Sequence, residues 1–128
     1  MSKVQRIATA EAPSPAGHYA QATVAGGLVH VSGQLPIVAD GAERPRDFEA
    51  QAKVALGNML TILAAAGCGP ADVLKVNAYI VGIEHWPAFN GVFAKAFGEA
   101  RPARVVVPVP ELHHGYLVEV DAVAVQPG

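Results

Sequence analysis

Residues 117–125 read Leu-Val-Glu-Val-Asp-Ala-Val-Ala-Val, an apolar segment with two carboxylates at alternate positions. Successive side chains of a β-strand point to opposite faces. One face of a strand here therefore carries only valine and alanine, and the other carries Glu119 and Asp121 among apolar neighbours. The small apolar face suits close packing beneath helices. We therefore expect the two carboxylates on a face of the sheet that no helix covers.

Two amphipathic segments upstream of this strand predict the helices. The first follows Asp47, a residue suited to the N-cap, and ends near Gly67, a natural C-terminal glycine. Its apolar residues recur at spacings of three and four, and they are Phe48, Ala52, Leu56, Met59, Leu63 and Ala66. The second covers residues 86–97 and ends at Gly98. Its three phenylalanines are four residues apart, so we expect them in the core.

Short apolar or alternating segments predict the other strands, at residues 3–9, 19–24, 28–32, 73–81 and 104–109. In the 73–81 strand we expect Leu74, Val76, Ala78 and Ile80 to share one face. Because both helices fall between strands, they would cover one face of a single mixed sheet. We therefore expect an α+β two-layer sandwich, with a single domain over residues 1–128.

The composition is short of charge for a soluble domain. Charged residues make up 16% of the 128 residues and hydrophobic residues 52%, whereas about 25% charged is usual. No apolar run approaches the roughly 20 residues that span a membrane, and no signal peptide is visible at the N-terminus. The remaining explanation is that apolar surface meets another copy of the chain, so we expect a homo-oligomer that does not associate with membranes.

Cysteine content and net charge exclude further classes of protein. Cys68 is the single cysteine, which rules out an internal disulfide framework and a cysteine zinc cluster. Together with the absent signal peptide, this favours a cytoplasmic location. The net charge of −2 provides no basic field for nucleic acid. The adjacent His113 and His114 do not converge on one ion as helical pairs do, so no metal site is predicted.

Three charged positions allow more than one interpretation. Glu119 and Asp121 either face solvent on an open sheet or lie in an interface, where they would need partners or shifted pKa values. Arg104 is the first residue of an apolar strand. An arginine at such a position often lays its aliphatic stem along apolar surface and keeps its charged group in solvent. Its guanidinium group is also suited to bidentate capture of a carboxylate.

Several segments, in the same order and spacing, resemble the RidA/YjgF family over residues 5–126. They include Ala-Pro-Ser-Pro-Ala-Gly-His-Tyr at 12–19, Val-Ser-Gly-Gln-Leu-Pro at 31–36 and Arg-Pro-Ala-Arg at 101–104. The helix at 47–67 and the strand at 118–124 resemble the family's helix and last strand.

The resemblance implies a chorismate-mutase-like α+β fold and a homotrimer with active sites in the clefts between subunits. Many family members hydrolyse reactive enamines and imines, such as 2-aminoacrylate and its imine 2-iminopropanoate, to 2-keto acids and ammonia. They need no metal or organic cofactor, so none is expected here.

The resemblance also implies roles for particular residues. Arg104 matches the arginine that binds the substrate carboxylate, and Glu119 matches the glutamate that positions or activates the attacking water. The remaining positions that we expect to bind substrate are Tyr19, Ser32, Gly33, Asn90, His18 and His114. His18 and His114 are included because each lies near the expected cleft. The alternative for both is that they face solvent.

The sequence departs from the family at three places. Val106 replaces the usual cysteine two residues after the arginine, and His18 replaces the usual proline. The segment 108–115, with His113 and His114, faintly resembles the 2-aminomuconate deaminase branch. These departures leave two alternatives open: a deaminase of a different substrate, and a non-catalytic trimer that binds small carboxylates. Ribonuclease activity, reported for some relatives, would need a basic groove that an acidic chain lacks.

Overall fold

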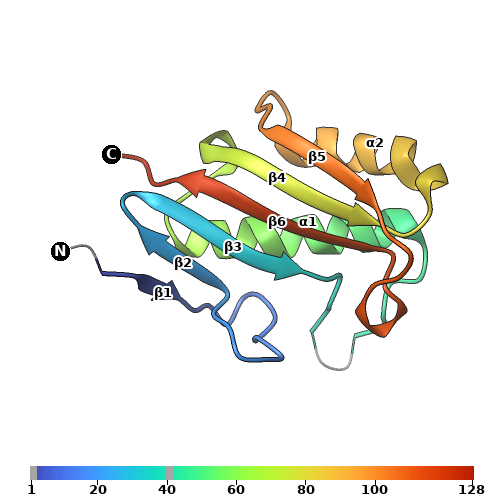
Figure 1. Ribbon diagram of the computed structural model, residues 1–128, viewed down its shortest axis with the longest axis horizontal. Coiled ribbons are helices and arrows are strands. Elements are labelled where there is room, and N and C mark those ends of the chain that lie inside the picture. The colour runs from blue at the N-terminus through green and yellow to red at the C-terminus, as the bar shows by residue number, and fades with distance from the viewer. Residues whose placement is uncertain (1–2, 40–41) are drawn as a thin grey trace.

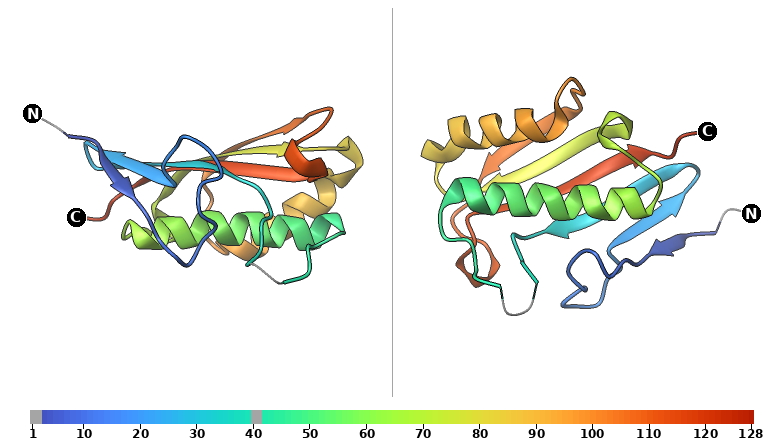
Figure 2. Two further views of the ribbon diagram at one scale, coloured as in Figure 1. Left: turned by 90° about the horizontal axis from the view of Figure 1, so that it is seen from below. Right: turned by 180° about the vertical axis from the view of Figure 1, so that it is seen from behind.

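The computed structural model describes residues 3–39 and 42–128, which form one mixed sheet with two helices on one of its faces (Figures 1 and 2). The helices are α1 (Phe48–Ala65) and α2 (Trp86–Phe97). The strands are β1 (Gln5–Ile7), β2 (Ala22–Ala25), β3 (Leu28–Gln34), β4 (Val73–Ile80), β5 (Ala103–Pro108) and β6 (Val118–Val125). Short 3₁₀ turns lie at Pro70–Asp72, Ile83–His85 and His113–Gly115. The predicted order of elements and the two-layer α+β architecture are confirmed.

The strand order across the six-stranded sheet is β1-β2-β3-β6-β4-β5. β4 and β5 run parallel, and α2 connects them, while the other neighbours run antiparallel. The last strand, β6, is therefore central, and β5 forms an edge (Figure 1). This order brings the end of β3 next to the start of β6.

Local sequence explains where α1 begins and how it packs. The Asp47 side chain accepts a hydrogen bond from the Ala50 backbone N–H at 2.7 Å, which satisfies one of the free donors of the first turn. Gly67, with φ of +82°, follows the helix in the left-handed conformation that glycine favours. The predicted apolar stripe is buried, with Leu56, Met59 and Leu63 at most 1% exposed.

Side chains of β6 alternate between a buried face and a face without helices, as predicted. Its valine and alanine residues at 118, 120, 122 and 124 are at most 1% exposed beneath the helices. Glu119 and Asp121 lie on the opposite face and are half-buried. The phenylalanines of α2 are also in the core, and Phe89 is completely buried.

Two strand predictions differ from the structure. Strand β2 begins at Ala22 rather than at Tyr19, which lies in the preceding loop. Leu74 was expected to share a face with Val76, Ala78 and Ile80, but it is 48% exposed while those three are buried, and Val73 is buried in its place. The register between β4 and β6 shifts between Val73 and Lys75. Such a bulge adds one residue to a strand and reverses the alternation beyond it.

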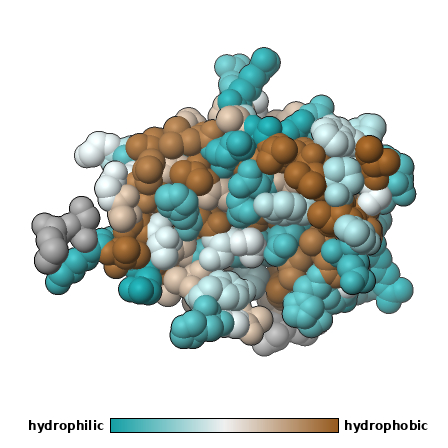
Figure 3. All heavy atoms as spheres, viewed as in Figure 1, coloured by the Kyte–Doolittle hydropathy of each residue, from teal (hydrophilic) through white to brown (hydrophobic). Residues whose placement is uncertain are grey.

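The face of the sheet without helices carries exposed apolar side chains, which Figure 3 shows as brown patches among polar groups. They include Leu28 and Val125 at one end and Val105 and Val107 on the edge strand, each 37–42% exposed. An exposed apolar surface of this kind is typical of an interaction face. None of the helices in the described part of the chain has the length and apolar character of a membrane-spanning segment.

Candidate active site

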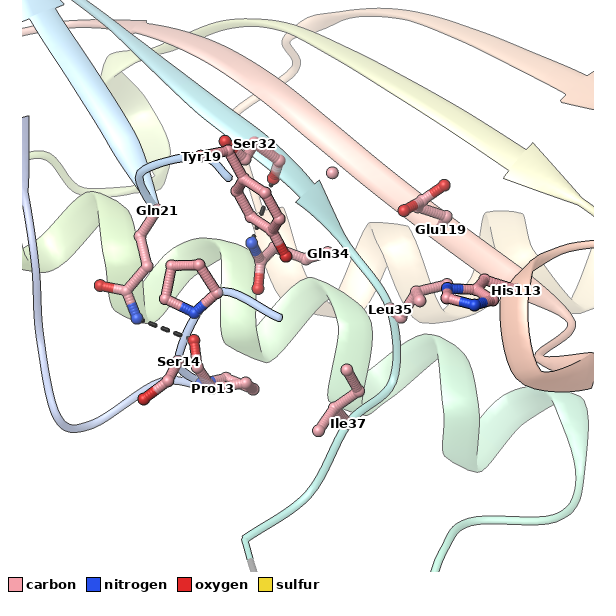
Figure 4. A pocket seen from close by; sticks show the side chains of 12 residues that line it. Pro13, Ser14, Tyr19, Gln21, Ser32, Gln34, Leu35, Ile37, His113 and Glu119 are labelled. Carbon is pink, nitrogen blue, oxygen red and sulfur yellow. Dashed lines mark hydrogen bonds between the residues drawn. The ribbon is translucent and has the colours of Figure 1, made fainter. Parts of the chain in front are cut away.

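A pocket of about 400 Å³ opens where the end of β3 meets the start of β6. Figure 4 shows Glu119 and His113 on one side of it and the loop that carries Tyr19 on the other. Its lining residues come from three segments, and they are Pro13, Ser14, Pro15, Tyr19, Gln21, Ser32, Gly33, Gln34, Leu35, Ile37, His113 and Glu119.

A β-bulge forms the part of the pocket wall that β3 contributes. Val31 pairs with Ala122 and Gln34 with Val120, so Ser32 and Gly33 together face a single residue of β6. The Ser32 hydroxyl donates a hydrogen bond to the Ala20 carbonyl at 2.6 Å, which ties the bulge to the loop before β2. Bulges bend a strand and redirect its side chains, and they are common beside active sites.

Gly33 leaves the space that the Glu119 carboxylate occupies. A Cβ atom on Gly33 would lie 2.9 Å from Glu119 Oε2 and 3.2 Å from its Cδ. Those distances are shorter than ordinary van der Waals contact, so any side chain here would displace the carboxylate. The glycine therefore fixes the position of the acid in the pocket through close approach of the backbone.

The surroundings of Glu119 favour its protonated form. Burial raises the pKa of the Glu119 carboxyl above its usual value, and the negative charge of Asp121 raises it further. His113 has the opposite effect and lowers the pKa of Glu119. Asp121 accepts a hydrogen bond from Asn77 Nδ2 at 2.8 Å. A half-buried carboxyl with a raised pKa is a better proton acceptor than an exposed carboxyl, and it is suited to accept and return protons.

Gln21 organises the loop on the other side of the pocket. Its side chain is 3% exposed, and Nε2 donates to the Pro13 and Thr9 carbonyls at 2.9 and 3.1 Å. Its Oε1 accepts from the Thr9 N–H at 2.7 Å. These bonds hold residues 9–13 against β2. Sequence reasoning missed Gln21, because an uncharged glutamine in a loop gives no signal of its role.

Arg104 and Asn90 lie at a second pocket, of about 460 Å³, between the end of α2 and the start of β5. Arg104 Nη1 donates to Asn90 Oδ1 at 3.0 Å, and the guanidinium carbon lies 4.9 Å from the centre of the Phe93 ring. The amide and the aromatic ring orient the guanidinium group without neutralising its charge. Arg104 is thus placed to bind an anion.

The two pockets lie on opposite faces of the sheet. Tyr79 of β4 pairs with Glu119 on one side and with Val107 on the other, and directly paired residues point to the same face. Arg104 lies three positions before Val107 in the same strand, so its side chain points to the opposite face. One strand separates β5 from β6, which puts these two strands about 10 Å apart. Within one chain, Arg104 and Glu119 therefore do not share a site.

The residues that the sequence predicts to bind substrate lie in different pockets of the structure. Tyr19, Ser32, Gly33 and Glu119 line the first pocket, while Asn90 and Arg104 line the second. His18 lies in a separate shallow pocket beside Arg6.

Of the two adjacent histidines, His113 lines the first pocket and the nominated His114 does not. Across residues 3–39 and 42–128, the histidine, cysteine and acidic side chains form no group of three that could hold a metal ion.

Comparison with known proteins identifies the family. The profile of the family described as Endoribonuclease L-PSP matches residues 9–126 of the 128. The chain belongs to the RidA/YjgF/RutC family. The goat 2-iminobutanoate/2-iminopropanoate deaminase is 39% identical over 127 residues, with 98% of this chain and 93% of that protein covered.

Solved structures of other RidA/YjgF/RutC proteins share the fold. TdcF of Escherichia coli with bound serine superposes with a TM-score of 0.91 and is 32% identical, covering 96% of this chain and 99% of TdcF. RidA from the Antarctic bacterium Psychrobacter has a TM-score of 0.89 and 35% identity, with 94% and 98% of the two chains covered. The chain is therefore a member of a family of deaminases that act on reactive imine intermediates.

Proposed function

We propose that this protein hydrolyses 2-imino acids, such as 2-iminopropanoate formed from 2-aminoacrylate, to 2-keto acids and ammonia. The observation that carries the proposal is the separation of Arg104 and Glu119. A 2-imino acid has a carboxylate that needs a cation and an imine carbon that needs a water and a base. Each pocket supplies one of these requirements, and neither supplies both.

A homotrimer would unite the two pockets. In a ring of identical subunits, one surface of a protomer meets a different surface of the next. Such an interface would bring Arg104 and Asn90 of one protomer to the Glu119 pocket of its neighbour. The exposed apolar residues on the helix-free face, including Val105 and Val107, support this assembly because a subunit contact would cover them.

Hydrolysis of an imine requires few catalytic groups, and Arg104 and Glu119 can supply them. The imine carbon is electrophilic, and more so when its nitrogen takes up a proton, so the protein has mainly to orient the substrate and supply an activated water. Arg104 would hold the carboxylate through two charge-assisted hydrogen bonds. Glu119 would accept a proton from the attacking water, which its raised pKa favours.

The test is a coupled assay in which a dehydratase or an amino-acid oxidase generates the imino acid. Release of the 2-keto acid is then followed with and without this protein, against the spontaneous rate. We expect acceleration with several imino acids, and light scattering of the same sample should give the mass of three chains. Binding of 2-keto acids without acceleration of any imine would contradict the proposal and favour a non-catalytic carboxylate-binding protein.

A further inference from the structure

His113 lines the first pocket and has no role in the mechanism proposed above. It belongs to the 3₁₀ turn His113–Gly115, which precedes β6, and its ring lies near the Glu119 side chain (Figure 4). The two groups are close enough that the charge of His113 influences the ionisation of Glu119. Imidazole is the side chain that most readily gives and takes a proton near neutral pH.

The turn that carries His113 is held in place from outside the pocket. Arg44 Nη2 donates to the His114 carbonyl at 2.6 Å, and its guanidinium carbon lies 3.8 Å from the centre of the Tyr116 ring. Gln51 of α1 accepts from the Leu117 N–H at 2.8 Å. These contacts connect the backbone around the turn to α1 and to the loop before it.

The conformation of the turn also separates the two histidines. His114 has φ of +61°, in the left-handed region that few residues other than glycine adopt. The two rings stack, with centroids 3.8 Å apart, and only that of His113 lines the pocket. Of the two stacked rings, that of His113 is therefore the one that a substrate in the pocket would contact.

We propose that His113 is a catalytic residue, the general acid that protonates the imine nitrogen while Glu119 takes the proton of the attacking water. This inference rests on the proposed imine hydrolysis and adds a group to the same site. It predicts that the pocket works with an acid and a base side by side, one from the turn and one from β6.

The proton transfers balance over one turnover. In the first step water oxygen bonds to the imine carbon, its proton passes to the Glu119 carboxylate, and His113 in its cationic form protonates the nitrogen. The product is a neutral carbinolamine. In the second step protonated Glu119 gives its proton to the amino nitrogen, and the C–N bond breaks with its electron pair on nitrogen. The hydroxyl proton passes to His113, which leaves a 2-keto acid, ammonia and both side chains as they began.

Four other ionisable groups lie around His113. His114 stacks on it from the same turn, and Arg44 binds the His114 carbonyl from the loop before α1. Glu119 and the Tyr19 phenol line the same pocket, from β6 and from the loop before β2. Glu119 is the only carboxylate among these four.

The test compares His113→Asn with His114→Asn in the imine hydrolysis assay, using assembled protein of each variant. Asparagine tolerates the left-handed conformation at position 114, so the control keeps the turn. We expect H113N to lower kcat by about 100-fold, within the usual contribution of a general acid. The decline of kcat at high pH, where the acid loses its proton, should disappear in H113N and remain in H114N.

Chemical rescue gives a second measurement that a structural role would not affect. Added imidazole should restore part of the activity of His113→Ala, after subtraction of the rate that imidazole causes alone. Wild-type kcat and an unchanged pH profile in H113N would overturn the inference while leaving the proposed function intact. Loss of the high-pH decline in H114N instead would also overturn it. No turnover by the wild-type protein would refute the proposed function and the inference together.

Discussion

The Glu119 carboxylate lies 2.9 Å from the point that a Cβ atom would occupy on Gly33. Glu119 comes from β6, and Gly33 comes from the bulge in β3, which faces the same region of β6. The absence of a side chain at position 33 is therefore a condition for the position of the acid. Gly33 thus helps to shape the candidate site, although it has no side chain.

Gly33→Ala should fold and assemble but lose activity. The new methyl group would push the flexible end of Glu119 away from the bulge, and a misplacement of about 1 Å can cost 100-fold in rate. The measurement is kcat for imine hydrolysis together with the thermal unfolding temperature.

The matched control is Gly57→Ala in α1, where a Cβ atom would meet nothing within 4 Å. We expect this change to keep the activity and to stabilise the helix by about 0.5–1 kcal/mol. Equal activity of G33A and G57A would refute the role assigned to Gly33.

Arg104→Lys should impair the enzyme although the positive charge is retained. Lysine cannot make the paired hydrogen bonds that a planar guanidinium makes to a carboxylate. Loss of one charge-assisted bond costs about 1.5–3 kcal/mol, so we expect kcat/KM to fall about 10- to 100-fold. Arg46→Lys, at an exposed arginine before α1, serves as control and should retain wild-type values. A wild-type kcat/KM in R104K would remove the carboxylate-binding role.

Asp121→Asn should shift the pH dependence of activity toward acid. The negative charge of Asp121 contributes to the raised pKa of Glu119. As the pH falls through that pKa, Glu119 is protonated and can no longer act as a base. Removing the Asp121 charge lowers the pKa of Glu119, so the loss of kcat/KM on acidification should occur at lower pH in D121N. A shift toward higher pH would contradict this account of the pocket.

The fold could be predicted because it depends on patterns that the sequence displays directly. The alternation of residues 118–125 and the spacing of Phe89, Phe93 and Phe97 determine which side chains are buried, and both predictions are confirmed. Leu74 shows where this reasoning fails. A strand pattern assumes strict alternation, and a bulge interrupts it without leaving a mark in the sequence.

The candidate site was harder to predict from the sequence than the fold, because its geometry depends on how the strands pair. The residues Ser32 and Gly33 were nominated through the family resemblance, but their bulge and its contact with Glu119 depend on pairing between β3 and β6. Likewise, Arg104 and Glu119 each lie on a predicted strand, yet only the strand order shows that they face opposite sides of the sheet. Sequence reasoning nominated His114, whereas His113 lines the pocket, because the conformation of the turn decides which of the two rings reaches it.

In the proposed trimer, each active site combines Arg104 of one subunit with Glu119 of another. To test this arrangement, two inactive variants, Arg104→Ala and Glu119→Gln, are mixed and co-refolded so that their subunits exchange. In randomly mixed trimers about a quarter of the interfaces would pair an intact arginine with an intact glutamate. We predict that about a quarter of wild-type activity returns on mixing, although each variant alone is inactive. If the mixed trimers stay as inactive as the parents, both residues act within one chain or neither is catalytic, and the account is wrong.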